Sequence, residues 1–302
     1  MAELTTAHVR QYGANVYECA QQKGSVLRNF VTVEDMIGEK RHFERVKPTT
    51  AVRVESKYSD TPLIHTQFDR RTVHGTEYAW ADMVDWMDQL NLLIDPTSNI
   101  VRVGGYALGR IIDDIIIQNG FSGKAYEGKD GLTEVAFPAS QQIPITFGGT
   151  GGASEGLTIS KLIEARSRFG NADIDLDDPE NELFIAVTQN QLDDLARSVE
   201  LGNRDYNAIR DLYEGKTKKF LGFTFVRTGR LLTTDVDGGR SRMCAAWCKS
   251  GVVLVVPKEI EMSIDRRPDK LNNWQAMGKM KAGATRIEDA KVVQIFCHEQ
   301  SA

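Results

Sequence analysis

Apolar and charged side chains alternate irregularly between residues 38 and 75, and Pro48 and Pro62 interrupt the run. Such alternation, with few apolar residues in total, is typical of extended strands. The pattern predicts a pair of strands with charged faces over 38–75. A hairpin of this kind buries too little apolar surface to be stable alone. We expect it to lie across a neighbouring subunit, and a solvated two-stranded ribbon is the alternative.

The next stretch has helical spacing. From Tyr78 to Ile94, apolar residues recur at three- and four-residue steps, which predicts an amphipathic helix over 76–94. Asp95 and Pro96 then provide an N-cap and a proline at the first helical position. A second, longer helix is therefore predicted over 96–119, before Gly120 as the C-terminal stop.

Two adjacent glycines, Gly104 and Gly105, lie inside this longer helix. Each costs about 1 kcal/mol in a helix interior relative to alanine. The pair predicts a place where the helix bends. The alternative is tight packing of another backbone against the helix.

Residues 1–37 contain only two short apolar stretches, neither of which could form a core. They predict an arm that lies on another surface. Residues 121–156 are rich in loop-forming residues, with short strands expected at 133–137 and 143–147. The run Gly148–Gly152 is a flexible joint by composition, and we place a domain boundary near it.

After this joint, helical and extended patterns alternate, which predicts a mixed α/β domain. The expected helices are 157–169, with Leu162, Ile163 and Ala165 inward, then 189–199 and 206–213. The expected strands are 183–187, 220–227, 245–247 and 252–256. The chain ends in a predicted hairpin of 275–287 and 291–297, with its turn at Glu288-Asp289.

Composition and charge exclude several classes of protein. The 302 residues have a net charge of −5 and a pI of about 5.7, without the basic excess of a dedicated nucleic-acid binder. Four cysteines without C-x-x-C spacing favour a reducing compartment over a disulfide framework. The N-terminal sequence lacks the pattern of a signal peptide, and no apolar run suits a membrane span. We therefore expect synthesis in a cytoplasm.

A search for catalytic or ligand-binding motifs finds none. Gly215-Lys216-Thr217 ends like a phosphate-binding loop, but Arg210 replaces the required glycine. The run Gly148–Gly152 does not complete a dinucleotide-binding motif. Asp173, Asp175 and Asp177 alternate as in a calcium loop without its glycine and glutamate, which favours a solvated acidic loop. We expect no catalytic residue, cofactor or metal.

Two further clusters have structural interpretations. Asp113 and Asp114 are adjacent in the long helix and point about 100° apart, so an isolated salt bridge or an exposed position is expected instead of an acid–base pair. Cys244 and Cys248 lie four apart in a strand-like stretch and therefore share one face, which suits core packing.

A set of short segments, collinear over about residues 40–297, resembles a family of phage major capsid proteins. The segments are Ser59–Leu63, Arg70-Arg71, Asp82–Leu90, Asp95–Ser98, Phe220–Phe223, Arg227-Thr228, Ala246-Trp247, Lys249–Gly251 and Gly283–Arg286. None is unique alone, and their order and spacing carry the resemblance.

That family is similar to the Hong Kong 97 capsid fold, an α+β architecture. The resemblance implies an N-terminal arm (1–37), an extended loop (38–75), a peripheral domain (76–147) with a spine helix (96–119), an axial domain (148–270) and a C-terminal hairpin (271–302) that returns to the peripheral domain. It implies self-assembly into the hexamers and pentamers of an icosahedral phage head around double-stranded DNA, made in the bacterial cytoplasm.

The resemblance also suggests partners and residues. A separate scaffolding protein, a portal and possible decoration proteins are expected, and DNA would be met only non-specifically. The interface candidates are Arg45, Arg53, Lys57, Arg70 and Arg71, and the hinge candidates are Gly104 and Gly105. The alternatives are an encapsulin-like compartment, or an α/β enzyme with a site at Gly148–Gly152.

Overall fold

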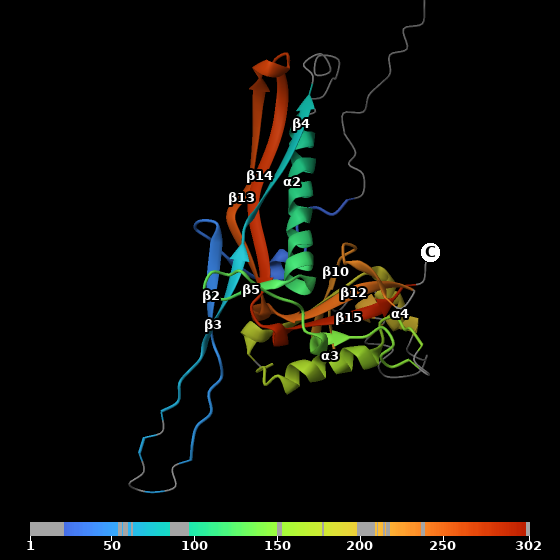
Figure 1. Ribbon diagram of the computed structural model, residues 1–302. Helices are drawn as coiled ribbons and strands as arrows, with labels where there is room; N and C mark the ends of the chain where they lie inside the picture. The colour runs from blue at the N-terminus through green and yellow to red at the C-terminus, as the bar shows by residue number, and fades with distance from the viewer. Residues whose placement is uncertain are drawn as a thin grey trace, which may run out of the picture. The chain divides into compact units, whose positions relative to one another are not determined.

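The structure is a computed structural model that describes residues 21–53, 56, 60–61, 63–84, 97–149, 153–176, 178–197, 209, 211–213, 215, 218–236 and 239–299 (Figure 1). Among these residues, no helix has both the length and the apolar character needed to cross a membrane. The chain forms two compact units. The first comprises residues 1–25, 77–111 and 258–280, and the second comprises 26–76, 112–257 and 281–302.

A seven-stranded mixed sheet forms the core of the second unit. Its order is β7-β15-β12-β8-β10-β9, and β11 also pairs with β12. The strands are β7 (Gln142–Ile143), β8 (Leu183–Val187), β9 (Lys219–Phe220), β10 (Phe223–Arg227), β11 (Thr233–Val236), β12 (Gly239–Cys248) and β15 (Val292–His298). Trp247 is fully buried in this core, and its ring lies 4.5 Å from that of Phe121. Helix α3 (Ile159–Asn171) packs beside β7 and β15, and α4 (Gln189–Arg197) follows β8 (Figure 1).

Two four-stranded sheets complete the fold. One has the order β2-β3-β5-β6, with β2 (Lys40–Val46), β3 (Phe68–His74), β5 (Ala125–Glu127) and β6 (Thr133–Val135). The other has the order β1-β13-β14-β4, with β1 (Thr32–Glu34), β4 (Thr76–Val84), β13 (Val252–Arg267) and β14 (Asn273–Arg286). Short 3₁₀ turns link many of these elements: Arg28–Phe30, Ala139–Gln141, Pro179–Asn181, Lys249–Gly251, Pro268–Lys270 and Asp289–Lys291.

The predicted long helix is confirmed as α2 (Thr97–Ile115), which continues as a π-helix, η2 (Ile116–Ser122). The predicted stop at Gly120 is wrong, because Gly120 is buried inside the π-helix. A side chain there would meet Val252, since an added Cβ would lie 2.8 Å from its Cγ1 atom. Gly120 therefore allows close packing against β13, and the helical run ends two residues later.

The predicted helix over 76–94 is wrong where the structure describes it, because residues 76–84 form strand β4. Residues 85–94 lie outside the described part. The spacing of Tyr78, Trp80 and Met83 fits a helix, but aromatic residues also favour strands. Pairing with β14 therefore decides the conformation, a non-local effect that a local pattern does not contain.

The predicted closing hairpin is also wrong. Strands β14 and β15 follow each other in sequence but belong to different sheets. The neighbour of β14 is β13, and the turn between them contains Pro268–Lys270, followed by Leu271 and Asn272 in the left-handed region (φ 53° and 60°).

Other sequence expectations are met only in part. The expected strand 220–227 is two strands, because Leu221 and Gly222 form a turn with positive φ. Helix α3 buries Leu162 and Ala165 as predicted, but Ile163 is 55% exposed and Lys161 is buried in its place. Strand β8 is buried as predicted. Of the helix expected over 206–213, the structure describes residues 209 and 211–213, all helical.

The arm prediction fails for residues 26–36. Leu27, Val31 and Met36 are buried within their own chain. Met36 packs with Val73, Val253 and Val255, and the Trp247 indole N–H donates to the carbonyl of Phe30 at 2.9 Å. This part of the arm therefore belongs to the core of its own subunit. Residues 1–20 lie outside the described part.

Candidate assembly surface

The extended loop predicted over 38–75 consists of β2, β3 and the chain between them. The two strands pair antiparallel, from Lys40 opposite His74 to Val46 opposite Phe68. The described residues between 47 and 67 belong to no strand, and all of them are exposed. Figure 1 shows this connection running beyond the ends of β2 and β3. The predicted strand pair is confirmed at its base, and the rest is an exposed loop.

Five large apolar side chains of this segment are exposed. Leu63 is 83% exposed and Phe68 is 71% exposed, and Val46, Val52 and Ile64 are also exposed. Fully burying such a side chain contributes about 1.5–3 kcal/mol. Exposed apolar side chains on one extended segment would be buried if that segment lay against another protein.

Three arginines and three carboxylates form a charge network at the base of the loop. Arg45 on β2 lies opposite Asp69 on β3 and forms an ion pair with it. The same guanidinium binds Glu127 on β5 at 2.7 Å and donates to the carbonyl of Ile287 at 2.8 Å. Opposite charges on facing strands are a favourable cross-strand pair, so the strand register places these groups together.

The two inner arginines of the network are almost fully buried, whereas their carboxylate partners, Glu127 and Asp289, remain about a quarter exposed. Arg71 is 1% exposed and binds Asp289 at 2.6 Å and Glu127 at 3.0 Å. Arg286 is 0% exposed, pairs with Asp289, and donates to the carbonyls of Gly123 and Val135. Three positive and three negative groups balance each other. Removing a carboxylate would leave positive charge on buried arginines without compensation, so this network resists changes in the direction of the loop.

Two members of the network have shifted pKa values. Burial lowers the pKa of Arg286, although Asp289 opposes the shift. For Asp69, burial raises the pKa, but the amide of Arg70 and the guanidinium of Arg45 outweigh it, so the pKa lies below its usual value. Asp69 is therefore ionised at neutral pH, as the ion pair with Arg45 requires.

The structure places the predicted interface residues as follows. Arg45 and Arg71 are bound within the chain, as members of the network. Arg70 pairs with Glu44 and donates to the carbonyl of Lys129 at 3.2 Å. Arg53 is exposed on the loop, and Lys57 lies outside the described residues. An intermolecular role for these residues stays a prediction.

Sequence reasoning missed Glu127, Asp289 and Arg286. Arg286 was singled out only as part of a resembling segment. The three-residue spacing of Arg286 and Asp289 could have indicated an ion pair between them. The ion pair of Asp289 with Arg71 joins residues more than 200 positions apart, so no local sequence pattern predicts it.

The predicted hinge glycines have different surroundings. An added Cβ at Gly104 would lie 2.4 Å from two ring carbons of Trp80, whereas one at Gly105 would meet nothing within 4 Å. Gly104 therefore allows the Trp80 ring to pack against α2. The helix runs through both positions, and a hinge role stays a prediction.

A pocket of about 350 Å³ lies beside the base of the loop. It is lined by Thr72, Val73, His74, Thr76, Asn119, Lys124, Tyr126, Ala284 and Thr285. The rings of His74 and Tyr126 meet edge to face, with centroids 4.8 Å apart. The wall of this pocket is a mixture of polar and apolar side chains.

The alternative enzyme site at Gly148–Gly152 gains no support from the described residues around it. The ammonium nitrogen of Lys161 lies 2.7–3.1 Å from four carbonyl oxygens, those of Ile145, Glu155, Gly156 and Phe296, which share its three N–H groups. Lys161 therefore links Ile145, Glu155 and Gly156 to Phe296 on β15. Burial lowers the pKa of Lys161.

The described cysteines are packed in the core, as predicted for Cys244 and Cys248. Burial raises the pKa of Cys248 to about 12. A hydrogen bond with Cys297 and burial raise the pKa of Cys244 well above its usual value. Thiols of this kind are poor nucleophiles. In the part of the chain that the structure describes, no group of His, Cys, Asp and Glu side chains could hold a metal ion.

The two helix aspartates have separate partners. Asp114 forms the salt bridge expected for one of them, with both of its oxygens on Arg230. Asp113 is fully buried and accepts the backbone N–H groups of Val26 and Leu27 at 3.0–3.2 Å.

A family model described as phage capsid protein matches residues 4–299. The chain belongs to the phage capsid protein family. Comparison of this capsid protein with curated protein sequences gives no match.

Solved capsid structures have the same fold. The capsid protein of cyanophage P-SCSP1u is 15% identical, with a TM-score of 0.71 over 96% of this chain and 93% of that one. The capsid protein of Ralstonia phage GP4 is 11% identical, with a TM-score of 0.72 over 100% and 98%. That of cyanophage Pam1 is 11% identical, with a TM-score of 0.72 over 100% of both chains. The predicted Hong Kong 97-like α+β fold is confirmed.

Proposed function

We propose that this capsid protein is the major head subunit of a tailed phage and assembles into the hexamers and pentamers of an icosahedral shell. The observation that carries the proposal is the extended loop, which presents exposed apolar side chains on a buried, charge-balanced base. An isolated subunit leaves that apolar surface in water, whereas a neighbouring copy would bury it. The family match supports a phage head over an encapsulin-like compartment.

The role is structural and not enzymatic. Each contact between copies is modest, and a closed shell repeats it many times. The network of Arg45, Arg71 and Arg286 fixes the direction of the loop, so that the exposed side chains meet the neighbour in one register. The mixed charges of the loop, including Arg53, add specificity more than affinity.

The same proposal assigns partners and location. A separate scaffolding protein would guide assembly, a portal would occupy one vertex, and decoration proteins are further candidate partners. The shell would enclose double-stranded DNA in the virion after synthesis in the bacterial cytoplasm. The net charge of −5 favours tolerance of packaged DNA over tight binding.

The test removes the apolar surface but keeps the base. Replacing Leu63, Ile64 and Phe68 together by serine should leave a folded subunit that forms no regular shells. Each side chain forfeits up to about 1.5–3 kcal/mol at every contact. The matched control is Leu132→Ser, because Leu132 is 73% exposed and lies outside the loop.

Both variants are expressed under the conditions in which the wild-type chain forms shells, and particles are counted by sedimentation and electron microscopy. Shells from the control but not from the triple variant support the proposal. Normal shells from the triple variant contradict it.

A further inference from the structure

The pocket beside the base of the extended loop lies wholly within the second unit and has room for a small ligand. Its volume of about 350 Å³ is at the lower end of the range for small-molecule sites. A water molecule takes up about 30 Å³ of the liquid, so the pocket has room for a ligand with on the order of ten non-hydrogen atoms. None of the six residues of the charge network lines it, so the pocket is a separate feature.

Strand register gathers the residues of one wall on a single face of the sheet β2-β3-β5-β6. Thr72 on β3 lies opposite Tyr126 on β5, so their side chains share that face. His74 is two residues from Thr72, and Lys124 is two residues from Tyr126, so the alternation along extended chain places them on the same face. The rings of His74 and Tyr126 meet edge to face. This wall therefore combines two rings, a hydroxyl group and an ammonium group.

The other lining residues come from β3, β14, the start of β4 and the π-helix η2. Ala284 and Thr285 on β14 are buried, and Thr76 is the first residue of β4. Asn119 lies in the middle of η2 and is exposed. π-helical turns are rare and are frequently found at functional sites. In this chain the π-helix brings a carboxamide group to the pocket.

The lining has hydrogen-bond donors and no acidic side chain. Lys124 is the only lysine or arginine among the nine lining residues, and none of the nine is an aspartate or a glutamate. The ammonium group of Lys124 has three N–H groups, and Glu134 on β6 accepts one of them. That hydrogen bond raises the pKa of Lys124, so the ammonium group is charged at neutral pH. An ion pair between side chains as exposed as these two is weakly held, so Lys124 is able to bind a ligand as well.

We propose that this pocket binds a small organic oxyanion, a carboxylate or a phosphate group on a short hydrocarbon or aromatic body. Lys124 and Asn119 bind the charged oxygens through their N–H groups. Val73, Ala284 and the ring of Tyr126 cover the apolar body. Such a ligand joins β3, β5 and β14 at the base of the extended loop, so it stabilises the folded subunit by mass action. The inference goes beyond the assembly role and does not depend on it.

The first experiment titrates the purified full-length chain with four probes by isothermal titration calorimetry. Phenyl phosphate and benzoate carry an oxyanion on a ring, inorganic phosphate has no ring, and benzyl alcohol has no charge. We expect one-to-one binding of phenyl phosphate or benzoate, at least about tenfold tighter than that of the other two probes, because each of those lacks one half of the contacts. The tighter of the two ring-bearing probes identifies the charged group that the pocket prefers. No binding of either, or equal binding of all four probes, would overturn the inference.

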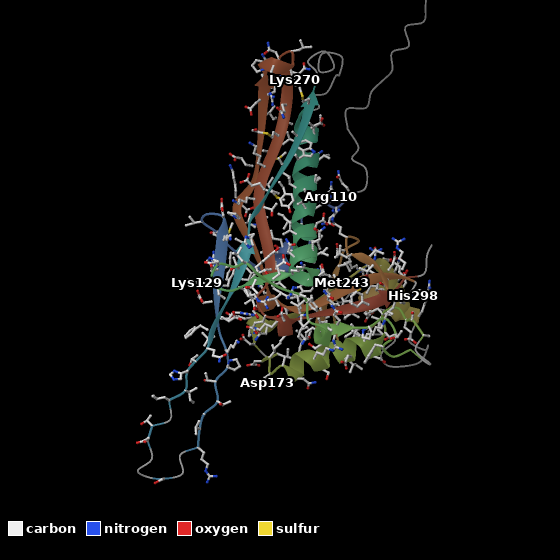
Figure 2. The ribbon with its side chains drawn as sticks, viewed as in Figure 1. Arg110, Lys129, Asp173, Met243, Lys270 and His298 are labelled. Atoms are coloured by element: carbon white, nitrogen blue, oxygen red, sulfur yellow. The ribbon has the colours of Figure 1, made fainter. Side chains whose placement is uncertain are left out.

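The second experiment repeats the titration with three variants. Lys124→Met removes the ammonium group, and Asn119→Asp replaces a donor by a negative charge. The matched control is Lys129→Met, because Lys129 is exposed on the turn after β5 and does not line the pocket (Figure 2). We expect the affinity to fall at least about tenfold in both pocket variants and to change less than about twofold in the control. Unchanged affinity in both pocket variants, or an equal loss in the control, would contradict the assignment.

Hydrogen exchange of the wild-type chain locates the ligand without any substitution. Saturating concentrations of the tighter probe should slow exchange in peptides that contain residues 72–76 and 119–126, and should leave the peptides of α3 unchanged. Slower exchange confined to other parts of the chain would place the ligand elsewhere and overturn the inference.

Discussion

The two glycines of α2 give a sharp prediction, because they are adjacent in sequence and differ in surroundings. In Gly104→Ala the new methyl carbon would lie 2.4 Å from the Trp80 ring, about 1 Å short of ordinary contact, which begins at 3.4 Å. Overpacking of this kind costs about 1–3 kcal/mol. The alanine also favours the helix by about 1 kcal/mol. The net expectation is a loss of stability of up to about 2 kcal/mol.

Gly105→Ala has the same helical gain without the clash, since nothing lies within 4 Å of the added carbon. We expect it to raise the free energy of unfolding by about 0.5–1 kcal/mol. The two variants should therefore differ by about 1–3 kcal/mol, which is the overpacking cost alone. Guanidinium denaturation of the unassembled subunit, followed by circular dichroism, measures this difference.

A double-mutant cycle locates the cause. Trp80→Leu should remove most of the penalty of Gly104→Ala and leave Gly105→Ala unchanged, because only Gly104 touches the ring. Equal stabilities for the two alanine variants would refute the packing of Trp80 on Gly104. If the glycine pair acts as a hinge, the long helix would change its curvature there when an assembled shell expands during maturation. Replacing both glycines by alanine should then impair that expansion, and unaltered expansion would contradict the hinge role.

Three further predictions concern Asp69, the cysteines and helix α3. Asp69→Asn should lower the free energy of unfolding at pH 7, because the lowered pKa of Asp69 confers stability while the carboxylate is ionised. The difference from the wild type should shrink as the pH falls below about 3.8, and a difference independent of pH in denaturant titrations would contradict this. At pH 8, a thiol reagent should modify at most one of the four cysteines in the native subunit and all four in guanidinium; rapid reaction of several native thiols would contradict the burial of the three in the core. Leu162→Ala should cost about 2–5 kcal/mol and Ile163→Ala less than about 1 kcal/mol, and equal losses on thermal denaturation would contradict the observed orientation of α3.

The sequence predicted elements best where the local pattern and the tertiary environment agree. Helix α2 has an apolar stripe along one face, and β8 is an uninterrupted apolar run that lies in a buried position. Residues 76–84 satisfy two periods at once, and their pairing with β14 selects the strand. The hairpin β13–β14 was missed because its turn signal, Pro268-Asp269, follows a strand whose second half is partly exposed and charged.

The candidate site was predictable only at the level of the segment. The sequence predicted a charged extended loop. It did not predict that the apolar side chains of this loop are exposed. The residues of the charge network come from β2, β3, β5, the end of β14 and the turn after it, so no single window of sequence contains them. Lys161 has the same explanation, since the carbonyls around it come from three separate segments.

The central claim is that the extended loop acts on a neighbouring copy and not on its own subunit. Electron cryomicroscopy of shells formed by the wild-type chain tests it directly, by tracing the residues between β2 and β3. The account predicts that Leu63 and Phe68 are buried against an adjacent subunit while Arg45 and Arg71 keep their own-chain partners. Shells in which these two apolar side chains remain in solvent, or fold back onto their own subunit, would contradict it.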